Sequence, residues 1–450
     1  MKKVLFSDTV GKIGIKPFII AVLVVLFLIP LSMITSLVHD REFYRDSAIQ
    51  SVLQPKGGEP VLEGLVLALP YEVTLEGRNA DGSVYKRKET RYILSVPQNW
   101  NFTAEVQPEY LVRGIFDVPV FSCDTLSSGN FQPVPYETFK VDENRILWDE
   151  AMLLVGISNK KNFTALPVIT VNGTPLEQSV TELQVSPFSH TVFFKMPADS
   201  VKQGFNYTMK ASLQGGNSLS LTPLAENNTF EITSDWPNPG FSGGWLPVER
   251  TVTDNGFEAR WDIAGLSTIY PKSWIATGGE EFGDMYGESI TAEFITPVDN
   301  YQKTMRSVKY AVLFLIIPFL TIFIFEIFTR VRIHPVQYCL IGFADVLFYL
   351  LLLAISEHLT FGMTYFISAL AVCLTTLGYG AAIFRKLKWG VLFALVQGIT
   401  YVFLFGTLQA EDYALLIGTL GLFCVVVALM VLTRKVDWYG TGVISEEKHE

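Results

Sequence analysis

The sequence has few of the residue types that carry covalent, redox or metal chemistry. It contains four cysteines and five histidines among 450 residues. Cys123 is the only cysteine outside the apolar runs, so no disulfide framework can form in the polar middle of the chain. His190 is the only histidine between residues 61 and 297, and we interpret it as structural. No nucleophile, zincin or phosphate-loop motif is present, so we expect no enzymatic activity, metal or cofactor.

Charged residues are also scarce. They make up 17% of the chain, whereas a soluble domain usually has about 25%. The shortfall lies in roughly the first 40 residues and in everything after about residue 308, while the middle has an ordinary soluble composition. The net charge of −10 excludes nucleic acid as a partner, because that requires a basic face. The composition therefore indicates a membrane protein with a large soluble insert.

Six apolar stretches are long enough to cross a bilayer of about 30 Å. The first, residues 17–37, lacks a small-residue cleavage site, so we interpret it as an uncleaved anchor rather than a signal peptide. The other five follow the soluble segment at residues 309–328, 338–356, 361–384, 389–408 and 413–432.

Basic residues in the short loops predict the orientation. They precede the first span, follow the second, separate the fourth from the fifth and follow the sixth: Lys2, Lys3, Lys12, Lys16, Arg330, Arg332, Arg385, Lys386, Lys388, Arg434 and Lys435. The alternate loops, "SEHLTFG" and "QAEDY", carry acidic or neutral residues. We therefore predict cytoplasmic termini (residues 1–16 and 433–450), an anchor (17–37), a periplasmic segment (38–308) and a five-helix bundle (309–432) in a bacterial inner membrane.

The soluble segment is dominated by predicted strands. They are β-branched, aromatic and often alternating, at residues 61–75, 85–96, 111–121, 151–158, 167–173, 190–197, 206–214, 227–236, 248–263 and 289–297. Asn172-Gly173 and Asp254-Asn255-Gly256 are typical of hairpin turns. Many short strands at this spacing predict one or two β-sandwiches. Both ends of the segment have helical spacing and predict a short two-helix stalk.

The stretch "SDWPNPGFSGGWLP", Ser234–Pro247, concentrates Trp236, Pro237 and Trp245 among prolines and glycines. One hypothesis is an aromatic platform for a glycan or a partner. The alternative, which we favour, is a rigid crossover loop whose aromatic rings fill the core.

The membrane part carries a few polar residues. Glu326 lies four residues before Arg330, a spacing that suits an ion pair on one helix. His334-Pro335 begins the third span, and proline is favoured in the first helical turn. We interpret the pair of Glu326 and Arg330 as anchoring rather than as a functional site.

Asp345 lies well inside the third predicted span, where an ionisable residue should face the bundle interior and find a partner. The candidates are Thr375, Thr376, Tyr379 and Gln397. A single such residue favours a hydrogen bond between helices over a proton or ion pathway. Glu357-His358 falls at the predicted periplasmic end of the same span. A metal site needs three or four ligands, so we interpret this pair as a boundary feature.

These motifs together resemble one family. "SDWPNPGFSGGWLP", "HPVQYCLIGFADVLFYLLLLAISEH" and "TRKVDWYG" are similar to motifs of the CreD family of bacterial inner membrane proteins, as is the layout of one span, a large β domain and five spans. The resemblance covers nearly the whole chain and departs from the family at Asn238 and Asp345. It implies a protein of cell-envelope integrity or envelope stress. Its motif positions are Trp236, Pro237, His334, Pro335, Glu357, His358, Asp437 and Trp438, to which it assigns no chemical role.

Three functions follow as hypotheses. The first is a non-enzymatic envelope protein whose β domain binds an envelope protein, lipid or glycan. The second is a proton- or ion-coupled transporter or lipid carrier that uses Asp345 and Gln397. The third is an intramembrane enzyme that uses His334, Glu357 and His358, but the first two of these lie about 35 Å apart along a helix. The sequence leaves the oligomeric state open.

Overall fold

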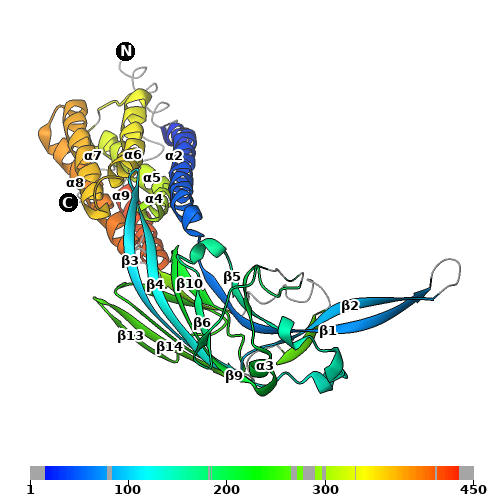
Figure 1. Ribbon diagram of the computed structural model, residues 1–450. Coiled ribbons are helices and arrows are strands. Elements are labelled where there is room, and N and C mark those ends of the chain that lie inside the picture. The colour runs from blue at the N-terminus through cyan, green and yellow to red at the C-terminus, as the bar shows by residue number, and fades with distance from the viewer. Residues whose placement is uncertain are drawn as a thin grey trace, which may run out of the picture. The chain divides into compact units, whose positions relative to one another are not determined.

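The computed structural model describes residues 16–78, 84–180, 183, 185–264, 271–276, 289–295, 300–329, 331–410 and 413–434. The chain divides into two compact units (Figure 1). We call residues 1–45 and 298–450 the helical unit, and residues 46–297 the β unit. Asp437 and Trp438, two of the motif positions, lie outside the described residues.

The helical unit is built from helices, all of them apolar except the polar helix α4. Their bounds are α2 (Lys16–Leu53), α4 (Asn300–Lys309), α5 (Ala311–Thr329), α6 (Pro335–Ser356), α7 (Phe361–Phe384), α8 (Leu387–Gln409) and α9 (Ala414–Thr433). Among the described residues, five helices are long and apolar enough to cross a membrane, namely α2, α5, α6, α7 and α8. The apolar stretch in α9, Leu416–Val431, is shorter. The predicted helix after the first span is present, because α2 runs unbroken to Leu53.

Among its described residues, the β unit contains two sheets of eight strands each. The first has β12 (Pro239–Gly243), β16 (Ile290–Phe294), β10 (Ser218–Leu221), β1 (Val61–Arg78), β2 (Val84–Ser95) and β15 (Ser273–Ala276) in spatial order. In addition, β5 (Met152–Ile157) pairs with β1, and β8 (His190–Lys195) pairs with β5. The second has β13 (Glu249–Thr253), β14 (Gly256–Ala264), β11 (Asn227–Ser234), β3 (Asn99–Arg113), β4 (Phe116–Phe131), β9 (Phe205–Gly216), β6 (Val168–Val171) and β7 (Thr174–Pro175). The short helix α3 (Ala198–Gln203) precedes β9. An all-β segment is thus confirmed.

The main hydrophobic core of the β unit takes residues from both sheets. Leu65 of β1 belongs to it together with Trp100 of β3 and Trp261 of β14, and all three are fully buried. The indole of Trp100 donates a hydrogen bond to Ser127 Oγ at 2.6 Å, so this buried polar group is satisfied. Alternation along β3 and β14 turns the intervening residues outward.

Two predicted hairpin turns are confirmed. Asn172 and Gly173 join β6 to β7 with φ angles of 50° and 87°, the left-handed conformation that a two-residue hairpin loop of this type requires. Asp254 and Asn255 join β13 to β14, where Thr253 pairs with Gly256.

One predicted strand, residues 111–121, was wrong. The chain turns there at Gly114, whose φ is 65°, and Arg113 pairs with Phe116. The residues instead form the adjoining ends of β3 and β4, and most of β3 was not predicted. An apolar pattern that continues through the turn conceals the turn, because only the glycine interrupts it.

Candidate functional site

The crossover loop turns its aromatic rings into the core. Trp236 is buried, and its Nε1 donates to the carbonyls of Asn238 and Ile295, each at 3.1 Å. The ring packs on Tyr110 and Phe294, with centroids 5.3 and 6.0 Å away. The loop passes from β11 in one sheet to β12 in the other and returns at β13. This geometry fits the crossover interpretation and offers no flat aromatic platform.

The remaining loop residues divide between core and solvent. Trp245 is half-buried against the core, and its carbonyl accepts a hydrogen bond from Trp261 Nε1 at 3.3 Å. Pro237 is exposed. Ser234 and Asp235, which begin the loop, line a surface hollow. The part of the loop that faces solvent beside this hollow is therefore its polar start, not its tryptophans.

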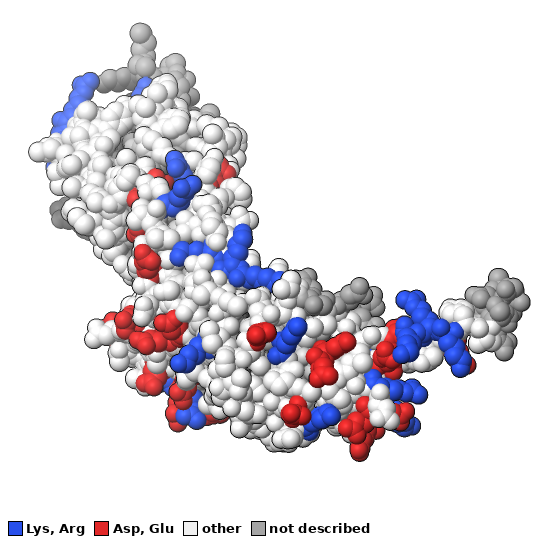
Figure 2. Space-filling model, viewed as in Figure 1, with Lys and Arg blue, Asp and Glu red and all other residues white. Residues whose placement is uncertain are grey.

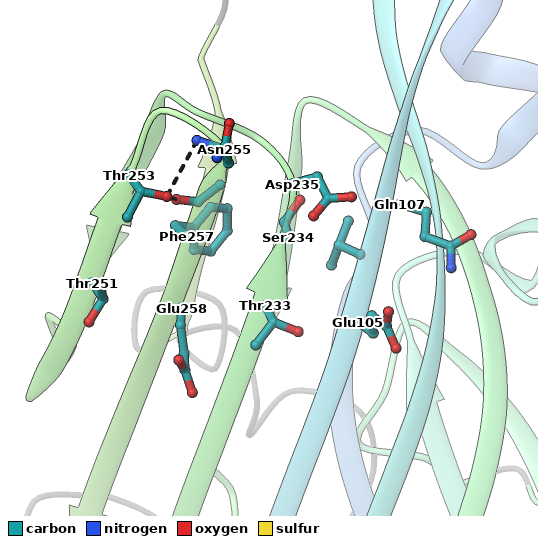
Figure 3. A pocket seen from close by; sticks show the side chains of 12 residues that line it. Glu105, Gln107, Thr233, Ser234, Asp235, Thr251, Thr253, Asn255, Phe257 and Glu258 are labelled. Carbon is teal, nitrogen blue, oxygen red and sulfur yellow. Dashed lines mark hydrogen bonds between the residues drawn. The ribbon is translucent and has the colours of Figure 1, made fainter.

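The hollow lies on the second sheet and has a volume of about 540 Å³ (Figure 3). Strand register builds its floor: Thr251 of β13 pairs with Glu258 of β14, Glu258 with Thr233 of β11, and Thr233 with Glu105 of β3. These four residues form one cross-strand row. Because neighbouring strands lie about 4.8 Å apart, the two carboxylates of the row are about 10 Å apart.

The walls of the hollow are polar. Gln107, Asp235 and Asn255 join the row, and the backbone N–H of Asn255 donates to Thr253 Oγ1 at 3.3 Å (Figure 3). Figure 2 shows acidic side chains gathered over the part of the β unit that holds β13 and β14. The arrangement suits a ligand rich in hydroxyl or amino groups and disfavours an anionic one, because its carboxylates would repel negative charge.

Glu326 in the helical unit has partners that the sequence analysis did not name. Its carboxylate forms a buried ion pair with Lys16 of α2 and accepts hydrogen bonds from Ile333 N at 3.1 Å and Tyr338 Oη at 3.0 Å. Arg330, the predicted partner, lies outside the described residues. Glu326 faces the interior, where α2 supplies the counter-charge. We call these four residues the Glu326 cluster.

His334 and Pro335 start α6. The side chain of His334 accepts a hydrogen bond from Val336 N at 3.3 Å, while the backbone N–H of His334 donates to Gln337 Oε1 at 2.9 Å. This reciprocal pair satisfies two donors at the helix start, and Pro335 occupies the first turn as predicted. The structure therefore gives both residues a role in helix capping.

Glu357, at the opposite end of α6, contacts residues of two other helices. Its carboxylate accepts a hydrogen bond from Tyr301 Oη at 3.2 Å and faces Arg41 Nε at 3.5 Å. Burial, with Glu357 adding, raises the pKa of Tyr301 to about 12. His358 is exposed beside it. Asn300 ties α4 to the same end through its side-chain amide, which donates to Ser356 O at 2.8 Å.

Asp345 is buried between α6 and α8. Its Oδ1 accepts from Gln397 Nε2 at 2.6 Å and lies 3.3 Å from Tyr401 Oη, a donor. Gln397 was among the predicted partners, whereas Thr376 donates to its own helix at Val372 O. Tyr401 was missed, although its position one helical turn after Gln397 was a usable signal.

Other chemistry-bearing residues have structural surroundings. His190 Nδ1 lies 2.8 Å from Ser158 O at the start of β8. Burial raises the pKa of the Cys123 thiol to about 12, so this cysteine is a poor nucleophile. Within the described ranges, no group of three or more His, Cys, Asp or Glu residues could hold a metal ion.

Comparison with known proteins gives a family match along nearly the whole chain. The family described as "Inner membrane protein CreD" matches residues 12–439. The inner membrane protein CreD of Escherichia coli (strain K12) is 30% identical over 428 residues, which cover 92% of this chain and 91% of that protein. Among solved structures, the match to a two-domain M1 zinc metallopeptidase bound to L-arginine covers 44% of this chain and 42% of the metallopeptidase chain, at 9% sequence identity. Its TM-score of 0.21 is too low to indicate a shared fold.

Proposed function

Because this chain belongs to the CreD family of inner membrane proteins, we propose that it acts in cell-envelope integrity or the envelope-stress response without catalysing a reaction. We propose further that it spans the membrane six times, with α9 as the last span and both termini in the cytoplasm. The basic loops support this orientation, which places the β unit in the periplasm. The core shared by its two sheets supports a sandwich.

We base the proposed binding function on the polar hollow of the β unit. Its cross-strand row lies on the outer face of the sheet, where Glu105, Thr251 and Glu258 are exposed and Thr233 is half-buried. We infer that it binds an envelope component with hydroxyl or amino groups, as a glycan or peptide of the cell wall has. An anionic lipid headgroup fits the carboxylates poorly. A protein partner would need basic residues opposite them.

In-cell photocrosslinking tests this proposal. A photoreactive residue at Thr251, in the hollow, should capture a wall fragment or a basic protein, and mass spectrometry would identify which. The matched position is Asn206, exposed on β9 of the same sheet but outside the hollow. The double change Glu105→Gln and Glu258→Gln should remove the capture. Equal capture from both positions, or capture that survives the double change, would overturn the proposal.

A second candidate function, a proton- or ion-coupled carrier, draws support from one observation. Asp345 is a buried carboxyl group without an ion-pair partner among the described residues. Asp345→Asn separates the two functions. Envelope function should survive this change if the hollow carries it, and should fail with normal protein levels if coupled transport carries it.

A further inference from the structure

Hydroxyl side chains in the helical unit behave in two different ways. Thr304, Thr376 and Thr407 each donate to the carbonyl four residues earlier in the same helix, at 2.8 to 3.0 Å. This is the usual solution for a hydroxyl group in a membrane helix. Thr364 and Ser368, both fully buried on α7, make no such bond. They are also one helical turn apart, so they lie on the same face of α7.

These two belong to a larger group. Within the described part of the helical unit, six buried side-chain oxygens have no hydrogen-bond partner. They are Ser307 Oγ on α4, Asp345 Oδ2 and Tyr349 Oη on α6, Thr364 Oγ1 and Ser368 Oγ on α7, and Gln397 Oε1 on α8. An unpartnered buried polar group costs about 1–3 kcal/mol. Such groups are commonly satisfied by internal water.

All six oxygens lie either at Asp345 or between it and the Glu357 end of the bundle. Tyr349 is one helical turn beyond Asp345 in that direction. Thr364 and Ser368 fall in the first two turns of α7, which begins just after Glu357. Ser307 lies two turns along α4 from Asn300, which bonds Ser356 at that end. Both α4 and α7 contact α6 and α8, the two helices that carry Asp345 and Gln397.

The opposite direction is closed by aromatic rings. Phe325 of α5 packs against Phe384, Trp389 and Phe393, with ring centroids 5.8, 4.9 and 6.5 Å away. Phe393 precedes Gln397 by one turn of α8, so this layer lies between Asp345 and the Glu326 end. Thr376, on the same side, has its hydroxyl bonded to its own helix.

We propose that Asp345 is a proton-binding site that exchanges with solution only at the Glu357 end of the bundle. Hydroxyl groups both donate and accept, so the unpartnered oxygens suit a short file of water and hydroxyl groups that leads a proton to Oδ2. Oδ1 is held by Gln397 and Tyr401. The site is independent of the hollow in the β unit and does not require the carrier function.

The titratable groups around Asp345 are uncharged side chains. Tyr349 on α6, Cys373 on α7 and Tyr401 on α8 are near enough to interact with it electrostatically. On α5 the carboxylate of Glu326 is already paired with Lys16. On α4, the unpartnered hydroxyl of Ser307 carries no charge. No described lysine or arginine forms an ion pair with Asp345, so proton uptake is the reaction that removes its charge in hydrocarbon.

Carbodiimide labelling of the full chain in sealed proteoliposomes tests the site and its sidedness. An apolar carbodiimide modifies a protonated carboxyl group in apolar surroundings, and mass spectrometry quantifies the Asp345 peptide. A single reporter cysteine at His358→Cys, with the four native cysteines replaced by alanine, identifies molecules whose Glu357 end faces outward. Raising the pH at that end should slow labelling by up to tenfold per pH unit. Raising it at the other end should leave the rate unchanged.

The double change Ser368→Ala and Thr364→Val tests the path. It should delay the response of labelling to pH, whereas Thr375→Val, a lipid-facing change on the same helix, should not. In detergent, both ends of the bundle are in contact with the same buffer. Once the protein has equilibrated there, labelling of Asp345 in the double variant should depend on pH as it does in the wild-type chain. This result would show that the fold of the variant is intact. Labelling that ignores pH at both ends, follows pH at the Glu326 end, or is blocked by Na⁺ at constant pH would overturn the proposal.

Discussion

The two units arrange polar and apolar groups in opposite ways. In the β unit, Trp100 and Trp261 fill the interior, while Glu105 and Glu258 point outward from the same strands. In the helical unit, large apolar side chains such as Val402, which is 73% exposed, cover the outside. Its ionisable residues Glu326 and Asp345 are inside. Figure 2 shows the same contrast, since the exposed face of the helical unit is largely uncharged.

The difference teaches where polar groups matter for stability. The β unit exposes polar side chains suited to water, and the helical unit exposes apolar side chains suited to the hydrocarbon of a bilayer. A carboxylate on the β unit is hydrated, so its loss should cost little free energy of unfolding. A carboxylate inside the helical unit has only protein partners, so the loss of one partner leaves an expensive buried charge. Three predictions examine this contrast, from the largest expected effect to the smallest.

Removing the indole of Trp236 should have the largest effect. Trp236→Ala deletes a buried ring and leaves two carbonyls without their donor, so we expect the β unit to lose about 3–5 kcal/mol of unfolding free energy. Pulse proteolysis in urea measures the change. Trp245→Ala, at a half-buried ring, is the matched control and should cost less. If both variants lost the same unfolding free energy, the depth of burial of the two rings would not determine how much each ring stabilises the β unit.

Breaking the Glu326 cluster from one side should destabilise the helical unit by about 3 kcal/mol. Lys16→Met leaves the Glu326 carboxylate, 9% exposed, without its counter-charge. Adding Glu326→Gln should restore most of the loss, because the amide carries no charge to compensate. Unfolding of the detergent-solubilised chain gives both values. If the double variant were no more stable than Lys16→Met, packing of the lysine stem, rather than charge, would account for the loss.

The smallest effect is a pH dependence at the Glu357 end. The pKa of Tyr301 is raised from 10.0 to about 12, first by burial and then by Glu357. The unfolded state therefore releases its proton first as the pH rises. The stability contribution of the protonated hydroxyl is complete below pH 10 and is lost between pH 10 and about 12.

Two variants check this window. Tyr301→Phe should remove the loss of unfolding free energy at alkaline pH. Glu357→Gln should narrow the pH range of this loss, because the carboxylate no longer raises the pKa of Tyr301. Unfolding free energies across the alkaline range provide the measurement. A profile of the wild-type chain that matches Tyr301→Phe would show that the hydroxyl does not titrate differently in the folded state.

The sequence predicted features that depend on near neighbours. The Asn172-Gly173 turn and the first turn of α6 at Pro335 were both found because each needs only a few adjacent residues. One distant contact was also foreseen in part: Gln397 was among four candidate partners of Asp345, because polar residues are rare in apolar helices. The turn at Gly114 was missed because apolar residues continue on both sides of it.

Other features built from distant segments could not be predicted. The hollow joins Glu105 to residues from 233 to 258 through a parallel pairing of β3 and β11, and local patterns do not specify which strands become neighbours. The ion pair of Glu326 with Lys16 joins residues 310 positions apart in the chain, and no local pattern indicates it. The unpartnered oxygens of Thr364 and Ser368 look no different in sequence from the backbone-bonded hydroxyl of Thr376.

The separation of Lys16 and Glu326 also has a consequence for biosynthesis. The ribosome must add 310 residues, including the whole β unit, before the two partners coexist. At about 5–20 residues per second, this takes roughly 15–60 s. During that interval α2 is in the bilayer with its lysine unpaired. A chaperone or the insertion machinery that shelters this helix would therefore act early, and its loss should leave chains in which the β unit is complete but the helical unit has not closed.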